Sequence, residues 1–343
     1  MITSVIFIGG GSNQLPFLKA LWSLNIKILL IDVNTDCPGK KYASVFVNKS
    51  NVDTSGIAKC LAQIATDYSK TFILNGCSGN PILTTAIIAN ELKIPSTYSI
   101  PVASLLIDKW QYKIRVKNLG LPTPSGSEIT EKGKMHLYNS NRWVLKPKVG
   151  SVSKKNLKLL KTTSSRFSQE FRPNFANYYA EEYIEGTDII FVSAVDGHNF
   201  LPISFIDEMN QVLPHGEIKS AKYRFPSKYV NAFLRSKIIG FTKTLTKNID
   251  HGRCILNLSF RVSGKNLYFI ESHIELGGDF ILQNLLNFAF GQTFLQKIML
   301  FLVANPSHRL SELTTNKVFT LALDKGEYKT ADGRKYQITQ HKH

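Results

Sequence analysis

Cysteine and long apolar runs are both scarce in this sequence. Its 343 residues include four cysteines, which are scattered without the spacing of a metal-binding motif: Cys37, Cys60, Cys77 and Cys254. Scattered cysteines of this kind are typical of buried thiols in a reducing compartment, so we expect a cytoplasmic protein. No apolar stretch reaches the ~20 residues that a membrane-spanning helix needs, and the longest, near 294–304, is broken by Gln296 and Lys297. The sequence therefore predicts neither a cysteine-bound metal nor a membrane-spanning helix.

Acidic residues are also in short supply. The chain has 25 Asp and Glu against 42 Lys and Arg, which gives a formal net charge of +17. So basic a chain is a candidate for binding nucleic acid, because the phosphate backbone attracts positive charge. The basic residues are spread along the chain, however, without a helix-turn-helix, zinc-finger or RNA-binding motif. We therefore expect no nucleic-acid partner, and nucleic-acid binding remains an alternative hypothesis that depends on charge alone.

The N-terminal third has the pattern of an open α/β domain. Apolar residues 2–8 predict a strand that runs into Gly9–Gly11, and helical spacing follows over Leu15–Leu24. A second predicted strand ends at Asp32, which completes a βαβ unit of the dinucleotide-binding type. The contiguous glycines match G-x-G-x-x-G poorly, because that fingerprint spaces its glycines around a pyrophosphate. A nicotinamide-dependent oxidoreductase is therefore a secondary hypothesis.

The middle of the chain carries lysines beside a loop of small residues. Asp108 and Lys109 begin a basic helix that we expect to end at Gly120, since glycine is typical at helix C-termini. The predicted strand RWVLKPKV then carries Lys146, and a loop of small and basic residues follows at 150–155. Small residues allow backbone N–H groups to approach a phosphate, and lysines add positive charge. This stretch is a candidate phosphate site, and a basic surface hairpin is the alternative.

The C-terminal half is rich in predicted strands. The run YYAEEYI (178–184) is expected to pair with IIFVSAV (189–195) across the intervening turn. The runs CILNLSF and LYFIES predict an antiparallel hairpin whose second strand carries Glu271 near its end. A helix-like apolar pattern follows from Phe280 to Leu302. A carboxylate at a strand end beside a glycine-rich turn suits Mg²⁺, which prefers hard oxygen ligands, or is simply exposed to solvent.

In this order the segments resemble the ATP-grasp superfamily of carboxylate–amine ligases. The resemblance covers about residues 2–303 and depends on four motifs: DKWQYKIRVKNLGLPTPSG, WVLKPKVGSVSKK, YAEEYIEGTD and ILNLSFRVSGKNLYFIESHIELGGDF. The GGDF ending is most similar to the amino-acid ligases that form dipeptides. The resemblance implies an α/β fold in which an open parallel-sheet domain precedes a two-lobed ATP-grasp unit of α+β character. The implied boundaries are 1–105 for the first domain, 106–190 for the small lobe with its leading helices, 191–303 for the large lobe and 304–343 for a peripheral element.

The resemblance also implies a nucleotide site for ATP and Mg²⁺. Residues expected to contact the phosphates are Lys109, Lys146 and the loop residues Gly150, Ser151, Ser153 and Lys154. Adenine and ribose contacts are expected from Glu181, Glu182, Ile184 and Asp188. The expected metal ligands are Glu271, Asn257 and His273, and the candidate catalytic cations are Arg261 and Lys222.

The implied reaction joins two small molecules. ATP would phosphorylate a carboxylate, and an amine or a similar nucleophile would then displace phosphate, which leaves ADP and phosphate as products. Basic residues around Lys222 favour an anionic acid substrate, and a homodimer is left open. The sequence departs from the family at Asn257, His273 and Glu275, where a second acid, Asn and Arg are usual. A catalytically weakened protein that binds nucleotide or substrate as a partner subunit is therefore the alternative function.

Overall fold

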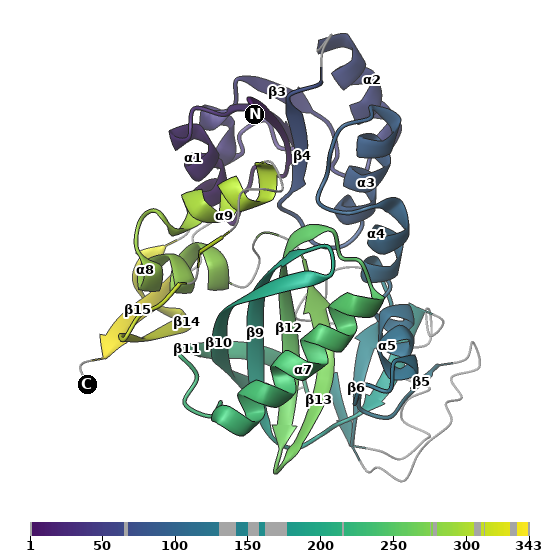
Figure 1. The fold of residues 1–343 in the computed structure, drawn as a ribbon, viewed down its shortest axis with the longest axis vertical. Helices are drawn as coiled ribbons and strands as arrows, with labels where there is room; N and C mark the ends of the chain where they lie inside the picture. The colour runs from purple at the N-terminus through teal and green to yellow at the C-terminus, as the bar shows by residue number, and fades with distance from the viewer. Residues whose placement is uncertain are drawn as a thin grey trace.

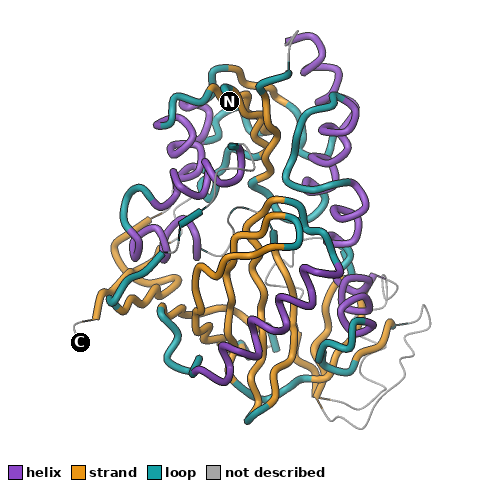
Figure 2. The backbone as a smooth tube through the Cα atoms, viewed as in Figure 1, coloured by secondary structure: helices purple, strands orange, loops and turns teal. Residues whose placement is uncertain are grey.

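Three sheets make up the body of the protein. The computed structural model describes residues 2–64, 68–129, 142–149, 158–161, 177–214, 216–274, 276, 280–304, 310–311, 313–329 and 335–341. In Figure 1 the N-terminal domain lies at the top, the large sheet lies below it, and the smaller sheet lies at the lower right. Figure 2 shows helices on both sides of the N-terminal sheet, while strands dominate the lower part of the molecule.

The N-terminal domain is the predicted open parallel sheet. Its strands follow the order β3-β2-β1-β4 and are β1 (Ser4–Ile8), β2 (Lys27–Asp32), β3 (Val45–Asn48) and β4 (Thr71–Asn75). Near-continuous apolar runs form these strands because both faces of a parallel sheet are covered by helices. One face packs on α1 (Leu15–Ser23), and the other packs on α2 (Thr54–Ile64) and α3 (Pro81–Glu91). A 3₁₀ turn, η1 (Pro38–Tyr42), lies between β2 and β3.

Two helices lead into a small antiparallel sheet. They are α4 (Ile100–Ile107) and α5 (Lys109–Asn118), and α5 is capped by the Asp108 carboxylate, which accepts from the Gln111 N–H at 2.9 Å. Gly120 follows with a left-handed φ of 73°, as the sequence predicts for the end of this helix. The sheet has the order β5-β8-β6-β7, formed by β5 (Gly126–Glu128), β6 (Arg142–Pro147), β7 (Lys158–Lys161) and β8 (Tyr178–Glu182).

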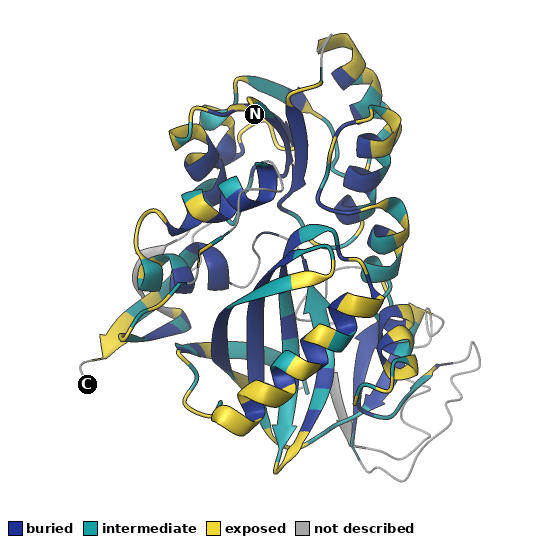
Figure 3. Cartoon of the chain, viewed as in Figure 1, coloured by how far each residue is buried: buried dark blue, intermediate teal, exposed yellow. Residues whose placement is uncertain are grey.

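The large lobe is a seven-stranded antiparallel sheet in the order β13-β12-β9-β10-β11-β14-β15. Its strands are β9 (Thr187–Asp196), β10 (Asn199–Val212), β11 (Ile218–Phe225), β12 (Arg253–Ser263), β13 (Asn266–His273), β14 (Val318–Lys329) and β15 (Lys335–His341). Helix α7 (Ala232–Asn248) crosses one face diagonally and packs Ile238, Phe241 and Leu245 against it. On the other face lie η3 (Ile281–Leu286), α8 (Asn287–Phe290) and α9 (Phe294–Val303). Figure 3 shows the central strands as the buried part of this lobe, with the outer face of α7 exposed.

Helix α9 connects the large lobe to the N-terminal domain. It contacts α1, and buried apolar residues of both helices belong to one core cluster that also includes one face of the N-terminal sheet and one face of the large sheet. Because a shared apolar core of this kind is costly to open, the two units are held together by burial rather than by a single linker. No described helix is both long enough and apolar enough to cross a membrane.

One sequence prediction about the C-terminal half is wrong. The runs 178–184 and 189–195 do not pair, because β8 belongs to the small sheet and β9 to the large one. The chain crosses between lobes at 183–186, where Gly186 lies so close to β12 that an added Cβ would be 2.0 Å from the Val262 carbonyl oxygen. The helix-like pattern predicted from Phe280 to Leu302 is confirmed over most of its length, although it is divided into η3, α8 and α9, and Gly291 separates the last two with a φ of 90°.

Candidate functional site

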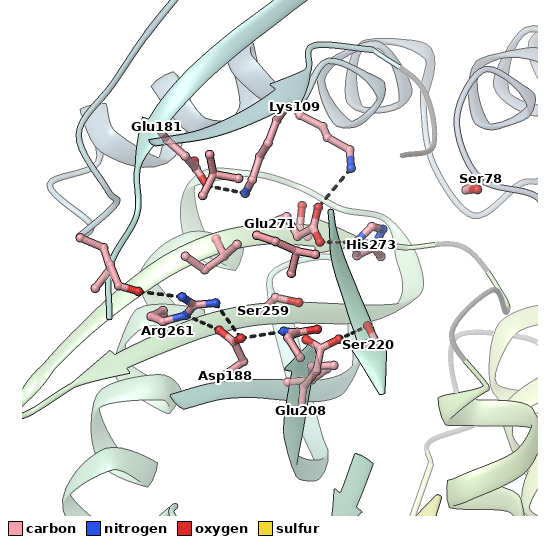
Figure 4. Close-up of a pocket in the computed structure, with 18 of the residues that line it drawn as sticks. Ser78, Lys109, Glu181, Asp188, Glu208, Ser220, Ser259, Arg261, Glu271 and His273 are labelled. Carbon is pink, nitrogen blue, oxygen red and sulfur yellow. Dashed lines mark hydrogen bonds and ion pairs between the residues drawn. The ribbon is translucent and has the colours of Figure 1, made fainter. Parts of the chain in front are cut away.

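A cavity of about 260 Å³ lies where the small lobe faces the large sheet. The small lobe contributes residues of β6, β8 and α5, and strands β9 to β13 contribute the opposite wall. Ser78 and Gly79, from the loop between β4 and α3, reach the cavity from the N-terminal domain (Figure 4). Predicted site residues that line this cavity are Lys109, Lys146, Glu181, Glu182, Ile184, Asp188, Arg261, Glu271 and His273.

Glu181 is held between two lysines in the buried part of the small lobe. The Lys113 ammonium donates to Glu181 Oε2 at 2.5 Å, and the Lys146 ammonium forms an ion pair with Oε1. All three side chains are buried. Burial alone would raise the pKa of Glu181, but Lys113 and Lys146 outweigh it and lower that pKa. Burial lowers the pKa of Lys113, and Glu181 opposes that shift.

Glu271 reaches the cavity because of a bulge in β13. Asn257 and Ser259 of β12 pair with His273 and Glu271, but the next pair is Phe260 with Phe269, so Ile270 is an extra residue. Side chains alternate along a strand, so without the bulge Glu271 would share the face of Phe269, which packs in the core under α7. The bulge instead directs Glu271 toward the cavity, beside His273 (Figure 4).

The Glu271 carboxylate is charged and already paired. Lys109 Nζ lies 3.1 Å from Oε2, and His273 Nε2 lies 3.4 Å from Oε1. Burial would raise the pKa of Glu271, but the Lys109 ammonium, and after it His273, hold that pKa well below its usual range. Lys109 is the first residue of α5, so the start of this helix positions its backbone, and the pair with Glu271 holds its ammonium.

Arg261 pins the segment that crosses between the lobes. Its Nε and Nη2 donate to both oxygens of Asp188 at 2.5 and 2.7 Å, and its Nη1 donates to the Ile184 carbonyl at 2.6 Å. Asn210 Nδ2 donates to the same Asp188 at 2.7 Å. A bidentate arginine–carboxylate pair is both strong and directional. Arg261 therefore ties Ile184 of the crossing segment and Asp188 of β9 to β12.

Asn257 carries a buried acceptor without a partner. Its Oδ1 is shielded from solvent and has no hydrogen-bond partner among the residues that the structure describes. An unpaired buried carbonyl oxygen is costly, and a cation would satisfy it. Asn257 faces the same side of the sheet as Glu271, so two hard oxygen donors are available there, as Mg²⁺ prefers. The described residues contain no group of three His, Cys, Asp or Glu suited to a metal ion, so these donors alone make only a partial site.

Comparison with known proteins gives matches in structure. No family model matches the sequence, and no curated protein matches it. An N5-carboxyaminoimidazole ribonucleotide synthetase in complex with ADP has a TM-score of 0.76 at 14% identity, over 94% of this chain and 82% of that chain. The L-amino acid ligase from Bacillus licheniformis has a TM-score of 0.76 at 15% identity, over 95% and 81%. The biotin carboxylase domain of Hydrogenobacter thermophilus 2-oxoglutarate carboxylase, in complex with MgADP and bicarbonate, has a TM-score of 0.71 at 16% identity. The match covers 94% of this chain and 74% of that chain.

The chain has the ATP-grasp fold. The predicted resemblance and architecture are confirmed at the level of the fold, with a parallel-sheet domain followed by two lobes. At these identities the likeness establishes the fold and leaves the residues of the cavity to be judged by their own geometry.

Some of the predicted site residues lie elsewhere or outside the described part of the chain. Lys222 is exposed on β11, and because side chains alternate it points away from the face on which Tyr223 lines the cavity. Its neighbour Lys219 pairs with Asp324 instead of facing the cavity. The loop residues Gly150, Ser151, Ser153 and Lys154, together with Glu275, lie outside the described residues.

Sequence reasoning missed several residues at or behind the cavity. Lys113 is absent from the described lining but pairs with the lining residue Glu181, and its spacing of four residues from Lys109 on a predicted helix is a signal that could have identified it. Glu208 and Asn210 of β10 and Ser220 of β11 line the cavity, and Ser220 Oγ donates to Glu208 Oε1 at 2.6 Å. No local motif marks these three, because strands distant in sequence bring them together.

The turn at Gly9–Gly11 makes its close contacts with other parts of the same chain. The Gly10 N–H donates to Asp32 Oδ2 at 2.6 Å, and the Gly10 carbonyl accepts from the Gly39 N–H at 2.8 Å. A Cβ on Gly10 would lie 2.7 Å from Cys37 Sγ, so glycine is required for η1 to pack there. Asp32 therefore holds the turn, whereas an acid in that position would bind ribose in a dinucleotide site.

Proposed function

We propose that this protein is an ATP-dependent ligase that joins a carboxylate to an amine, or to a similar nucleophile, and releases ADP and phosphate. One observation carries the proposal. A single cavity between the lobes brings together Lys109, Lys146, Glu181, Asp188 and Glu271, in a fold shared with enzymes that have been solved with ADP. An enzyme of phosphoryl transfer needs cations for the phosphates, hydrogen-bond acceptors for the base and the ribose, and a carboxylate that can hold a metal ion.

In this proposal the nucleotide lies along the cavity. Lys109 and Lys146 contact the phosphates, Glu181 accepts from the adenine amino group, and Asp188 is the acceptor for the ribose hydroxyls. Glu271 and Asn257 would hold Mg²⁺, which when bound supplies charge neutralisation at the transferred phosphoryl group. Supporting this assignment, the Lys146 ammonium makes an ion pair but no well-directed hydrogen bond to any described residue. A buried ammonium without a well-directed hydrogen bond is stabilised when an anionic ligand accepts from it.

The reaction that we infer has two displacements. A carboxylate oxygen of the acid substrate attacks the γ-phosphorus of ATP, the bond to the bridging oxygen breaks, and ADP leaves with that electron pair. The amine then attacks the acyl carbon, phosphate departs, and the amine loses its proton. Catalysis of this kind depends on positioning and on charge rather than on a covalent side chain. The lysine ammonium groups would stabilise negative charge that develops on the phosphoryl oxygens.

A second candidate function is nucleotide binding without turnover. It is favoured by the metal site, where Asn257 offers a neutral amide oxygen on the same face as Glu271 and the described residues contain no group of three His, Cys, Asp or Glu suited to a metal ion. With one carboxylate, a site can hold one metal ion but balances the charge of two poorly. Under this alternative the protein binds ATP and acts through a partner subunit.

A binding measurement followed by a product assay tests the proposal. Calorimetry should detect ATP binding that Mg²⁺ strengthens, and the double variant Lys109→Met/Lys146→Met should lose it. Lys148→Met is the matched control, because Lys148 pairs with Glu128 at 2.5 Å and does not line the cavity formed by the described residues. A panel of carboxylic acids and amines, including acids with extra anionic groups, is then screened for ADP and phosphate. Absence of ATP binding would reject both candidates, and binding without turnover would favour the second.

A further inference from the structure

The group formed by Lys113, Glu181 and Lys146 has an unbalanced charge. One carboxylate faces two ammonium groups, and all three side chains are buried. A buried excess cation is unfavourable, because low-dielectric surroundings penalise an uncompensated charge. The surplus positive charge is therefore satisfied best by an anion that enters from the cavity.

The two lysines are not equivalent in this group. Lys146 lines the cavity, and its ammonium makes no well-directed hydrogen bond to a described residue. Lys113 is absent from the described lining of the cavity and donates a hydrogen bond to Glu181 at 2.5 Å. Its ammonium also lies 5.9 Å from the centre of the Tyr179 ring, which packs against Trp110. Lys146 is thus the lysine that can turn toward a ligand, while Lys113 stays with the carboxylate.

We propose that Lys113 is a positioning residue that keeps Glu181 ionised while Lys146 turns from Glu181 to the phosphates of the nucleotide. The proposal rests on the nucleotide site inferred above. When Lys146 leaves, Oε1 of Glu181 becomes free to accept the N–H of the adenine amino group. The exchange conserves charge, since Lys146 gains the phosphate as its partner and Lys113 remains the counter-ion of Glu181.

The charge of Glu181 decides which nucleotide base the site selects. An ionised carboxylate can only accept hydrogen bonds, so it suits the 6-amino group of adenine and repels the 6-oxo group of guanine. A protonated carboxyl group can donate, and it would accept guanine as well. Sites that hydrogen-bond one group of a substrate discriminate strongly against an analogue that cannot make that bond. By keeping Glu181 ionised, Lys113 sets the preference for ATP over GTP.

The test replaces Lys113 with methionine, which has similar length and no charge. Calorimetry of ATP binding near pH 7, in two buffers that differ in ionisation enthalpy, measures the protons taken up on binding. Wild type should show little uptake from this group. Lys113→Met should take up close to one proton, because Glu181 loses its last counter-ion when Lys146 turns away. The ratio of ATP to GTP affinity should fall by at least about tenfold, the worth of a charge-assisted hydrogen bond.

Two controls separate this role from a structural one. Lys117→Met removes an exposed lysine one turn further along α5 and should change neither proton uptake nor the ATP to GTP ratio. In Lys113→Met/Glu181→Gln the carboxyl group that would take the proton is itself removed, so the extra uptake should vanish. Lys113→Gln keeps a neutral donor for Glu181 and should behave as Lys113→Met does, so it provides the readout if the methionine variant does not fold.

The outcomes also separate this inference from the proposed function. If wild type fails to bind ATP, the nucleotide site itself is wrong. If wild type binds ATP and the Lys113 variants match Lys117→Met in proton uptake and in the ATP to GTP ratio, the nucleotide site stands and the role of Lys113 is refuted.

Discussion

Replacing Glu271 with glutamine should remove the dependence of ATP binding on Mg²⁺. In the free protein the Glu271 carboxylate is paired with the Lys109 ammonium at 3.1 Å. A phosphate must take Lys109 away from Glu271, and Mg²⁺ must take Glu271 away from Lys109. Each ligand alone therefore breaks the pair: phosphate leaves Glu271 with His273 as its remaining neighbour, and Mg²⁺ takes the counter-ion of Lys109 away. When both bind, Lys109 faces phosphate and Glu271 faces the metal, so the two ligands should assist each other.

The size of this coupling follows from the exposure of the pair. A charge-assisted hydrogen bond is worth about 1.5–3 kcal/mol. The Lys109 and Glu271 side chains are 14% and 30% exposed, so water screens the pair and the lower end applies. About 1.5 kcal/mol corresponds to roughly tenfold in affinity. Saturating Mg²⁺ should therefore tighten ATP binding by about tenfold in wild type.

Calorimetric titration with ATP, with and without Mg²⁺, on wild type and Glu271→Gln measures the coupling directly. In the variant Lys109 is free, so metal-free ATP should bind more tightly than to wild type, and Mg²⁺ should add little. Glu128→Gln is the control, since Glu128 pairs with Lys148 on the small lobe, and it should keep the wild-type dependence. If Glu271→Gln responds to Mg²⁺ as strongly as wild type does, the exchange at Lys109 is refuted.

Three further predictions concern other parts of the molecule. Lys146→Met should weaken ATP binding about ten- to hundredfold while circular dichroism shows a folded protein, whereas Lys148→Met should bind normally. An active ligase supplied with hydroxylamine should yield a hydroxamate together with ADP, and AMP as the nucleotide product would exclude the acyl-phosphate route. Burial lowers the pKa of His251 from 6.5 to about 4. The unfolded chain therefore binds a proton at His251 at a higher pH than the folded protein does. As a result, the free energy of unfolding should fall by about 3 kcal/mol as the pH drops from above 6.5 to 4. Urea unfolding of His251→Gln should show a shallower decline across that range, and an unchanged slope would contradict the assignment.

Local patterns predicted the N-terminal domain well. Runs such as residues 5–8 and 72–74 are apolar at every position, and a sheet that is covered on both faces buries such runs. The end of α5 at Gly120 was predictable for a similar reason, because a left-handed residue ends a helix regardless of its tertiary surroundings. These features depend on the chemistry of neighbouring residues in the sequence.

Pairings between distant segments were not predictable. The strand after Glu182 looks like the second half of a hairpin, but Gly186 and Arg261 direct it to another sheet through contacts with β12. The bulge at Ile270 reverses the face on which Glu271 lies, and nothing in the run LYFIES marks the extra residue. The pairing of Glu181 with Lys113 joins residues 68 positions apart. Each of these depends on tertiary contacts that periodicity does not reveal.

The described lining of the cavity is net negative, so we expect a nucleotide to bind together with cations. Its described lining has five carboxylates, Glu181, Glu182, Asp188, Glu208 and Glu271, against three permanent cations, Lys109, Lys146 and Arg261. Each of these cations is already paired with a carboxylate. A triphosphate adds more negative charge to a partly buried space, where Coulomb repulsion is poorly screened. The overall charge of +17 therefore does not account for nucleotide binding, since the described lining of this cavity is net acidic. Mg²⁺ at Glu271 and Asn257 would offset this excess of negative charge. The charge balance of the cavity therefore predicts metal-dependent nucleotide binding independently of how many metal ligands the site provides.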